Sequence, residues 1–187
     1  MEAKNWKLYE DLDSILYTEA QLRDAVAALG QRITRDYQGK KPALVCILKG
    51  ASVFFCDLIR QIDLPLEIDF MVVSSYGNGT VSTGEVEIKK DLGRSVNGED
   101  VIIVEDIVDS GTTLNYLKKV FGSRGVASLR ICSLLDKPAR RKADLTVDYS
   151  CFRIDDAFVV GYGLDYAERY RNLPDIGVLS PRIYEQK

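Results

Sequence analysis

The stretch of the sequence with the most chemistry-bearing side chains is EDIVDSGTT, residues Glu105–Thr113. It follows the apolar run Val101–Val104, which is typical of a buried strand. Two adjacent carboxylates are followed by a third acid, Asp109, and by hydroxyl residues around Gly111. At the start of a helix, the backbone N–H groups and hydroxyls of residues 109–113 would form a cradle for a phosphate group.

A simpler interpretation is that Asp109, Ser110 and Thr113 cap a helix, while the two preceding acids lie exposed at a strand end. Capping does not explain the pair Glu105 and Asp106, because adjacent carboxylates after an apolar strand repel each other unless a cation or a polyhydroxyl ligand binds them. A ligand site is therefore favoured. Neither G-x-x-x-x-G-K-[ST] nor G-x-G-x-x-G occurs in the sequence, so the expected phosphate site is of another kind.

The composition excludes several classes of function. The 187 residues include 25 Lys and Arg against 28 Asp and Glu, so the basic surface of a nucleic-acid-binding protein is not expected. No apolar run approaches the ~20 residues that span a bilayer, and we expect a cytoplasmic protein with no membrane partner. The sequence has no histidine, so acid–base chemistry must come from Asp, Glu, Lys or Tyr. Buried free thiols are expected at all cysteines, which are Cys46, Cys56, Cys132 and Cys151.

The hydrophobic pattern predicts the helices and strands that position these residues. From the length of the chain we expect one domain over residues 1–187. A capping box at 18–21 begins a helix that ends near Gly39, a second helix ends near Arg60, and a third follows Thr113. The expected strands are 43–48, 66–74, 85–92, 101–104, 127–135 and 158–160. This alternation predicts a doubly wound, mostly parallel α/β sheet with ligands at the carboxyl ends of the strands. The polar stretch Ser75–Gly84 is predicted to be a mobile loop.

The segment VIIVEDIVDSGTT, Val101–Thr113, resembles over its full length the phosphoribosyl pyrophosphate signature of phosphoribosyltransferases. The resemblance extends along nearly the whole chain in the pattern of the hypoxanthine branch, on the motifs Leu48–Gly50, Ser75-Tyr76, Leu135–Pro138 and Phe158–Arg171. It implies the type I phosphoribosyltransferase fold, a doubly wound, mostly parallel sheet with a small hood lobe and a flexible loop. It also implies a Mg²⁺-dependent purine-salvage enzyme whose substrates are a purine base and phosphoribosyl pyrophosphate, built as a homodimer or homotetramer.

The resemblance implies roles for the residues that contact phosphoribosyl pyrophosphate. Glu105 and Asp106 would hold the ribose 2- and 3-hydroxyls, directly or through Mg²⁺. Asp109 would face N7 of the purine and act as the general acid/base, in addition to binding phosphate. The residues that would bind the 5-phosphate are Asp109, Ser110, Gly111, Thr112 and Thr113. The residues that would bind pyrophosphate are Lys49, Gly50, Ser75, Tyr76 and Arg171, with a cis peptide between Leu48 and Lys49.

The resemblance also implies a site for the base. Lys137 would donate to the purine O6, Phe158 would stack on the ring, and the Val159 backbone would contact its far edge. Asp165 would line the base pocket and bind a second Mg²⁺ through water. From the residues alone, Lys137 would be a solvated loop lysine, Phe158 and Val159 would be sheet core, and Lys49-Gly50 would be a plain turn. The segments 139–144 and 181–187 have no role in this pattern.

Two other functions stay open at this point. The chain could prefer another base, as xanthine-guanine and adenine transferases do. Lys137 argues against adenine, which presents a donor where an acceptor is needed, and Lys137 with the segment Phe158–Tyr162 favours the hypoxanthine branch. The same fold also serves as an RNA-binding regulator of pyrimidine genes. The acidic charge balance argues against RNA binding, and we expect no nucleic-acid partner.

Overall fold

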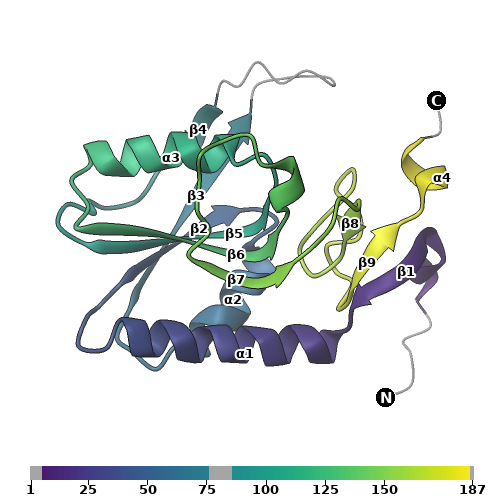
Figure 1. Ribbon diagram of the computed structural model, residues 1–187, viewed down its shortest axis with the longest axis horizontal. Helices are drawn as coiled ribbons and strands as arrows, with labels where there is room; N and C mark the ends of the chain where they lie inside the picture. The colour runs from purple at the N-terminus through teal and green to yellow at the C-terminus, as the bar shows by residue number, and fades with distance from the viewer. Residues whose placement is uncertain (1–5, 76–85, 186–187) are drawn as a thin grey trace.

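The computed structural model describes residues 6–75 and 86–185, and within them six strands form a central sheet in the order β4-β3-β2-β5-β6-β7 (Figure 1). The neighbouring strands pair in parallel, except β3 and β4, which are antiparallel. The strands are β2 (Ala43–Leu48), β3 (Glu67–Ser75), β4 (Val86–Lys90), β5 (Asp100–Val108), β6 (Ser128–Asp136) and β7 (Tyr149–Arg153). The predicted mostly parallel sheet is confirmed.

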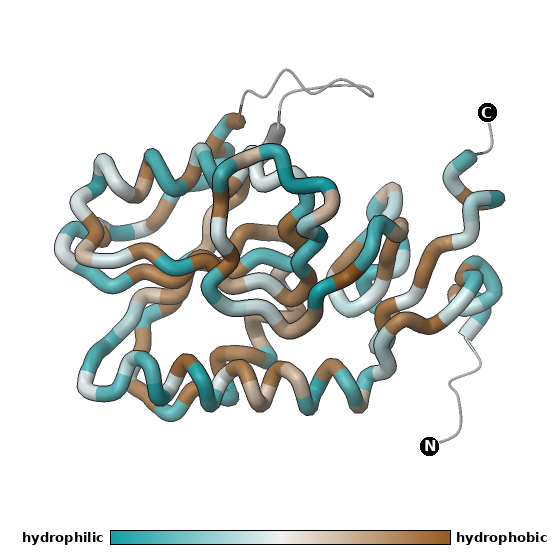
Figure 2. Tube along the Cα trace, viewed as in Figure 1, coloured by the Kyte–Doolittle hydropathy of each residue, from teal (hydrophilic) through white to brown (hydrophobic). Residues whose placement is uncertain are grey.

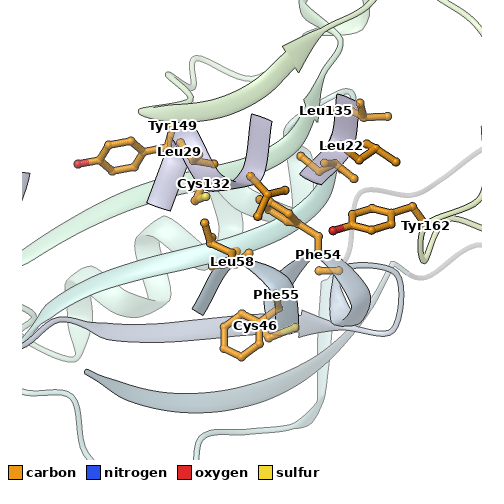
Figure 3. Packing of buried hydrophobic residues seen from close by; sticks show 14 of the residues in the cluster. Leu22, Leu29, Cys46, Phe54, Phe55, Leu58, Cys132, Leu135, Tyr149 and Tyr162 are labelled. Carbon is orange, nitrogen blue, oxygen red and sulfur yellow. The ribbon is translucent and has the colours of Figure 1, made fainter. Parts of the chain in front are cut away.

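Helices cover both faces of this sheet, which is why its central strands are apolar on both sides. Helices α1 (Glu19–Asp36) and α2 (Ser52–Ile59) lie on one face, and α3 (Thr112–Ser123) lies on the other (Figure 1). The core therefore has two layers, one packed against α1 and α2 and one against α3. Figure 3 shows the first layer, where Leu22, Phe54 and other helix side chains approach the sheet near Cys132.

Helix α1 forms for the reasons that the sequence indicates. The Thr18 side chain accepts from the Gln21 N–H, and the Gln21 side chain accepts from the Thr18 N–H at 2.9 Å, so the predicted capping box is present. Figure 2 shows apolar and polar residues interspersed along the helix, as an amphipathic helix requires. The predicted apolar stripe is buried, and its members are Leu22, Val26, Leu29 and Ile33.

A second, three-stranded sheet forms the hood lobe from both ends of the described chain. It consists of β1 (Leu12–Tyr17), β8 (Val159–Val160) and β9 (Ile176–Leu179) in the order β1-β9-β8, with antiparallel pairs. Short helical turns adjoin it, η1 (Lys7–Asp11) before β1 and α4 (Pro181–Tyr184) after β9; a third turn, η2 (Pro138–Arg140), follows β6. The hood is tied to α2 by the Tyr162 hydroxyl, which donates to Asp57 Oδ2 at 2.6 Å.

The strand predictions need correction at several places. Strands β1, β7 and β9 were not expected, because they are short and their pattern is set by the neighbours that they pair with. Strand β5 continues past the predicted end at Val104 to Val108, since its pairing with β6 continues through Glu105 and Ile107. The two acids therefore lie inside an extended strand and do not follow it.

The cysteines are all free, but only Cys46 and Cys132 are fully buried. Cys151 is partly buried and Cys56 is exposed on the outer side of α2, so the expectation of a buried thiol is wrong for Cys56. The predicted mobile loop Ser75–Gly84 lies outside the described residues, except for the backbone of Ser75 at the end of β3. Within the described part of the chain, no helix has the length and apolar character needed to cross a membrane.

Candidate active site

Three segments meet at the carboxyl ends of β2 and β5. Side chains alternate along a strand, so Asp106 shares the α1/α2 face with Val104, and Glu105 lies on the α3 face. A Cβ atom at Gly50 would lie 1.6 Å from Asp106 Oδ2, and one at Gly163 would lie 2.1 Å from the Gly50 carbonyl oxygen. The end of β5, the loop after β2 and the hood loop (residues 161–175, between β8 and β9) therefore touch. Only glycine fits at position 163, where the contact is with backbone, and a side chain at position 50 would displace the Asp106 carboxylate.

The acid pair on β5 is held in a setting that disfavours negative charge. Burial, and then the charge of Asp106, raise the pKa of Glu105 well above its usual range. Burial raises the pKa of Asp106 to about 6, although the Ile107 N–H donates to its Oδ1 at 2.7 Å. Among the ion pairs of the described residues, neither carboxylate has a cationic partner. A cation or a polyhydroxyl ligand would remove this electrostatic cost.

The carboxylates on β5 suit Mg²⁺ better than a metal ion that takes all of its ligands from protein side chains. Within the described residues, no group of three or more His, Cys, Asp or Glu side chains could hold a metal ion. Asp165 is close enough for its charge to raise the pKa of Asp106, yet it does not complete such a group with Glu105 and Asp106. Mg²⁺ keeps several waters and uses one or two carboxylates, which is what this end of β5 offers.

Residues 109–113 form the predicted loop at the start of α3. Gly111 is the N-cap, with φ 77° in the left-handed region, and no side chain caps the helix there. Ser110 Oγ and Thr112 Oγ1 lie 3.1 Å apart beside the open helix end. The loop lines a cavity of about 120 Å³ together with Glu105 and Leu114. The Thr112 N–H donates to Ser110 Oγ at 3.4 Å, so the capping interpretation holds for this one group. No side chain caps the helix at Gly111 itself, and the other N–H groups of the helix end suit an anion.

Asp109 presents a carboxylate oxygen with an unsatisfied hydrogen-bonding capacity. Its Oδ1 is buried and accepts no hydrogen bond among the described residues. The Arg140 Nε lies 3.4 Å from this oxygen, at ion-pair distance. A buried acceptor on the wall of the phosphate cavity is placed to exchange a proton with a ligand that enters next to it.

Behind this loop lies Arg141, which sequence reasoning missed. Its Nε donates to the Asp109 carbonyl at 3.0 Å, Nη1 to the Leu145 carbonyl at 3.1 Å and Nη2 to the Val108 carbonyl at 3.3 Å, and Nη2 also pairs with Asp136. The N–H groups of residues 142 and 143 donate to the Ser110 carbonyl at 2.9 and 3.1 Å. We call residues 140–145 the bracket. No sequence pattern predicts these contacts, because they join a side chain to carbonyl groups of another segment.

The residues expected to bind pyrophosphate are partly brought together. The Leu48–Lys49 peptide is cis, as expected. Lys49 Nζ lies 3.1 Å from Glu168 Oε1, and Arg171 Nη2 lies 2.8 Å from Asp165 Oδ1 and 3.5 Å from Glu168 Oε2. Glu168, which sequence reasoning missed, thus lies between the two cations. The side chain of Ser75 and all of Tyr76 lie outside the described residues.

Lys137 and Phe158 do not lie where their residue types alone would predict, which is in solvent for Lys137 and in the sheet core for Phe158. Lys137 is 5% exposed, its Nζ donates to the Ala157 carbonyl at 2.9 Å, and it pairs with Asp156 at 3.1 Å, so it is not a solvated lysine. Phe158 is 41% exposed and does not belong to the core, whereas Val159 is 7% exposed and does. A buried ammonium beside an exposed aromatic ring suits a flat ligand that carries a hydrogen-bond acceptor.

A larger hollow lies away from the acid pair. Its volume is about 720 Å³, and it is bounded by α1, α2, Tyr162 and residues 171–174. Of the residues predicted to bind the substrates, Arg171 alone is among those that line it. Because the carboxylates, the open helix end and the buried lysine all lie elsewhere, we place the candidate active site at the strand ends and not in this hollow.

Comparisons with known proteins agree with this geometry. The model of the phosphoribosyl transferase domain matches residues 13–167. The chain is 55% identical over 175 residues to the hypoxanthine-guanine phosphoribosyltransferase of Bacillus subtilis strain 168, covering 94% of this chain and 97% of the relative. It is 54% identical over 177 residues to that of Staphylococcus aureus strain Mu50, covering 95% and 99%. A crystal structure of a hypoxanthine phosphoribosyltransferase from Staphylococcus aureus matches with a TM-score of 0.95 at 52% identity, covering 98% of this chain and all of that one.

Proposed function

The chain belongs to the phosphoribosyl transferase family, in its hypoxanthine-guanine branch, and from this premise we propose that it transfers the phosphoribosyl group to purine N9. The donor is phosphoribosyl pyrophosphate, the acceptor is hypoxanthine or guanine, and the products are IMP or GMP and pyrophosphate. The observation that carries this proposal is the acid pair, which has no ion-pair partner within residues 6–75 and 86–185, beside an open helix end on the same strand–loop–helix unit.

Each part of the donor has residues that suit it. The carboxylates of Glu105 and Asp106 accept from the ribose 2- and 3-hydroxyls, because these half-buried groups have no cationic partner among the ion pairs of the described residues. The N–H groups and hydroxyls of residues 109–113 bind the 5-phosphate at the end of α3. Pyrophosphate lies between the loop at Lys49-Gly50 and Arg171, whose buried Nε has no hydrogen-bond partner among the described residues. Ser75 and Tyr76 stay predicted pyrophosphate residues at the edge of the expected closing loop.

Mg²⁺ is the cofactor that we propose. When bound, it neutralises the charge on pyrophosphate and so makes it a better leaving group. Glu105 and Asp106 would hold it through the ribose hydroxyls or directly, and Asp165 would hold a second ion through water, since Asp165 lies near Asp106 but forms no three-acid group with it. The homodimer or homotetramer and the cytoplasmic location stay predictions.

The acid–base work falls to Asp109. Purine N9 bonds to ribose C1 with inversion as the bond from C1 to the pyrophosphate oxygen breaks. Asp109 accepts the proton from N7 of the base, for which its buried Oδ1, which accepts no hydrogen bond among the described residues, is available. The remaining rate gain comes from holding the base and the ribose in line, which the fixed strand end and hood supply.

Selectivity for 6-oxopurines rests on Lys137. Its ammonium group is buried and can donate to a purine O6, while the exposed Phe158 ring stacks on the base. Adenine carries an amino group at this position, which would leave two donors facing each other. Such a mismatch at a buried charged group costs a factor of about 10⁴ or more in specificity.

The test is a steady-state assay of the whole chain with phosphoribosyl pyrophosphate, Mg²⁺ and one of four bases. We expect turnover with hypoxanthine and with guanine, and a kcat/KM for adenine lower by about 10⁴ or more. Xanthine is included because it also carries O6. Its kcat/KM relative to those of hypoxanthine and guanine therefore depends on other carbonyl groups near the base and not on Lys137. Turnover of adenine in preference to hypoxanthine, or no turnover of any purine, would refute the proposed function.

A further inference from the structure

The last helical turn of the described chain lies against the exposed aromatic ring of the candidate base site. The rings of Tyr184, in α4, and Phe158 are stacked, with centroids 4.9 Å apart and planes 21° apart. Tyr166 meets Phe158 edge-on at 5.7 Å and 84°, and it lies 6.3 Å from Tyr184. We call Phe158, Tyr166 and Tyr184 the aromatic cluster. It joins the hood loop, β8 and the C-terminal turn.

The aromatic cluster leaves one face of Phe158 open. Tyr184 covers one face of the ring and Tyr166 covers part of its edge, yet Phe158 is still 41% exposed. Among the aromatic contacts of the described residues, Tyr184 is the ring that stacks on Phe158, so we infer that the exposed area lies mainly on the face opposite Tyr184. An aromatic face that is open on one side and backed on the other is a surface on which a planar ring can stack.

The structure fixes Tyr184 firmly relative to Phe158. The Ser180 N–H donates to the Asp11 carbonyl at 2.9 Å, and Arg182 donates to the Glu10 carbonyl. The Leu179 N–H donates to the Phe158 carbonyl at 2.8 Å, so the strand that leads into α4 is bonded to the residue whose ring is stacked. Ile183 and Tyr184 both pack against the hood core of Val160, Tyr170, Leu173 and Leu179. The position of Tyr184 is therefore set by the hood and not by the base.

The backbone on the other side of Phe158 is also fixed. Lys137 Nζ donates to the carbonyl of Ala157, the residue before Phe158, at 2.9 Å. The ammonium group that would read the purine O6 and the ring that would stack on the purine are thus joined through one peptide. An error in the orientation of the Phe158 ring would shift the base relative to Lys137.

We propose, on the basis of the proposed function, that Tyr184 is a positioning residue for the purine base. It holds the Phe158 ring in one orientation, and with a base bound it forms the third layer of a stack that runs base, Phe158, Tyr184. Tyr184 does not touch the base itself. Its effect falls on the base and spares phosphoribosyl pyrophosphate, whose proposed contacts are on β5, the start of α3, the loop after β2, Ser75 and Tyr76, and Arg171.

The test compares variants at Tyr184 with a matched variant in the same turn. In Tyr184→Ala and Tyr184→Leu, loss of the stacked ring should raise KM for hypoxanthine by about 3- to 10-fold and leave KM for phosphoribosyl pyrophosphate within about 2-fold. Tyr184→Phe keeps the ring and should restore the wild-type KM. Ile183→Ala removes a neighbour that packs on the same hood core and should change neither KM beyond that range.

Other outcomes would overturn the inference. A lower KM for hypoxanthine in Tyr184→Ala would show that Tyr184 occupies the face that the base needs. Equal rises in both KM values, or a rise in Ile183→Ala as large as in Tyr184→Ala, would show that the turn only supports the fold. If Tyr184→Ala does not fold, the comparison of Tyr184→Leu with Tyr184→Phe decides the question. Inactivity of the wild-type chain with hypoxanthine would instead refute the proposed function.

Discussion

At the scale of single residues, Glu105 and Asp106 on β5 are placed to bind a ligand, and their burial lowers the stability of the free protein. Burial raises the pKa of both carboxyls: that of Glu105, which the charge of Asp106 raises further, lies well above its usual range, and that of Asp106 is about 6. A folded-state pKa above the unfolded value means that the folded protein binds the proton more tightly. Stability is therefore lost as the pH rises from the unfolded to the folded pKa, and at neutral pH the charged acids weaken the free protein.

The substitution Asp106→Asn tests this trade-off. We expect the free protein to gain about 1–2 kcal/mol in the free energy of unfolding at pH 7.5, because the amide keeps the shape and removes the desolvated charge. The gain should shrink as the pH falls from about 6 towards the ordinary value of 3.8, where wild-type Asp106 holds its own proton. Urea unfolding across this pH range measures both effects. A loss of stability at pH 7.5 would contradict the account.

How far residues could be predicted depends on where they lie in the chain. The acid pair and the loop of residues 109–113 are contiguous, so their types and order already indicate a phosphate site. Lys137, Asp165 and Arg171 come from separate segments and were assigned through the resemblance alone. Arg141 and Glu168 were missed, because their contacts are with carbonyl groups or charges that lie far from them in sequence.

At the scale of elements, the site depends on segments that fix one another. The bracket binds the carbonyl groups of the strand end and of Ser110 from behind. A peptide unit whose carbonyl is held on one side presents its N–H group on the other. The bracket therefore orients the open N–H groups of the phosphate loop towards the cavity of about 120 Å³.

Substitution of Arg141 should show this role of the bracket. In Arg141→Met, which keeps an unbranched apolar side chain but not the guanidinium donors, we expect KM for phosphoribosyl pyrophosphate to rise by about 10-fold or more, equivalent to ~1.4 kcal/mol, since the Asp109 and Leu145 carbonyl groups lose the donors of Arg141. KM for hypoxanthine should change much less. Lys142→Ala is the matched control, because its exposed side chain is removed while its N–H stays on the Ser110 carbonyl. Equal effects of the two substitutions would argue against the bracket.

The elements that the sequence predicted well are those with a strong local pattern. Helix α1 has a capping box and an apolar stripe, and β2 is a continuous apolar run with both faces covered. The edge strand β7 and the hood strands β1 and β9 have no such pattern, because partners that come from distant parts of the chain determine them. The extension of β5 to Val108 likewise depends on β6 and not on its own polar residues.

At the scale of the whole molecule, the hood and the central sheet are built as one unit. The hood sheet joins β1, from near the start of the chain, to β8 and β9, from near its end. Tyr162 of the hood loop packs in the same core layer as α1 and α2 and donates to Asp57. Asp175, next to β9, accepts from the N–H of Glu19 at the start of α1 at 2.6 Å.

This continuity leads us to propose that residues 1–187 unfold as one domain. Trp6, the single tryptophan, lies in the segment that precedes the hood strand β1, whereas far-ultraviolet circular dichroism follows the helices and the central sheet. We expect tryptophan fluorescence and circular dichroism to give the same midpoint in urea, as a two-state transition requires. Two separate midpoints would show that the hood is an independent unit.

The central claim is that the acid pair and the loop after β5 bind a sugar that carries phosphate groups, and calorimetry of the wild-type chain tests it most directly. Titration of phosphoribosyl pyrophosphate into the protein with Mg²⁺ should give saturable heat with one site per chain, which a chelator abolishes and Asp106→Asn weakens. Absence of any heat of binding from the folded wild-type protein in the presence of Mg²⁺ would contradict the account.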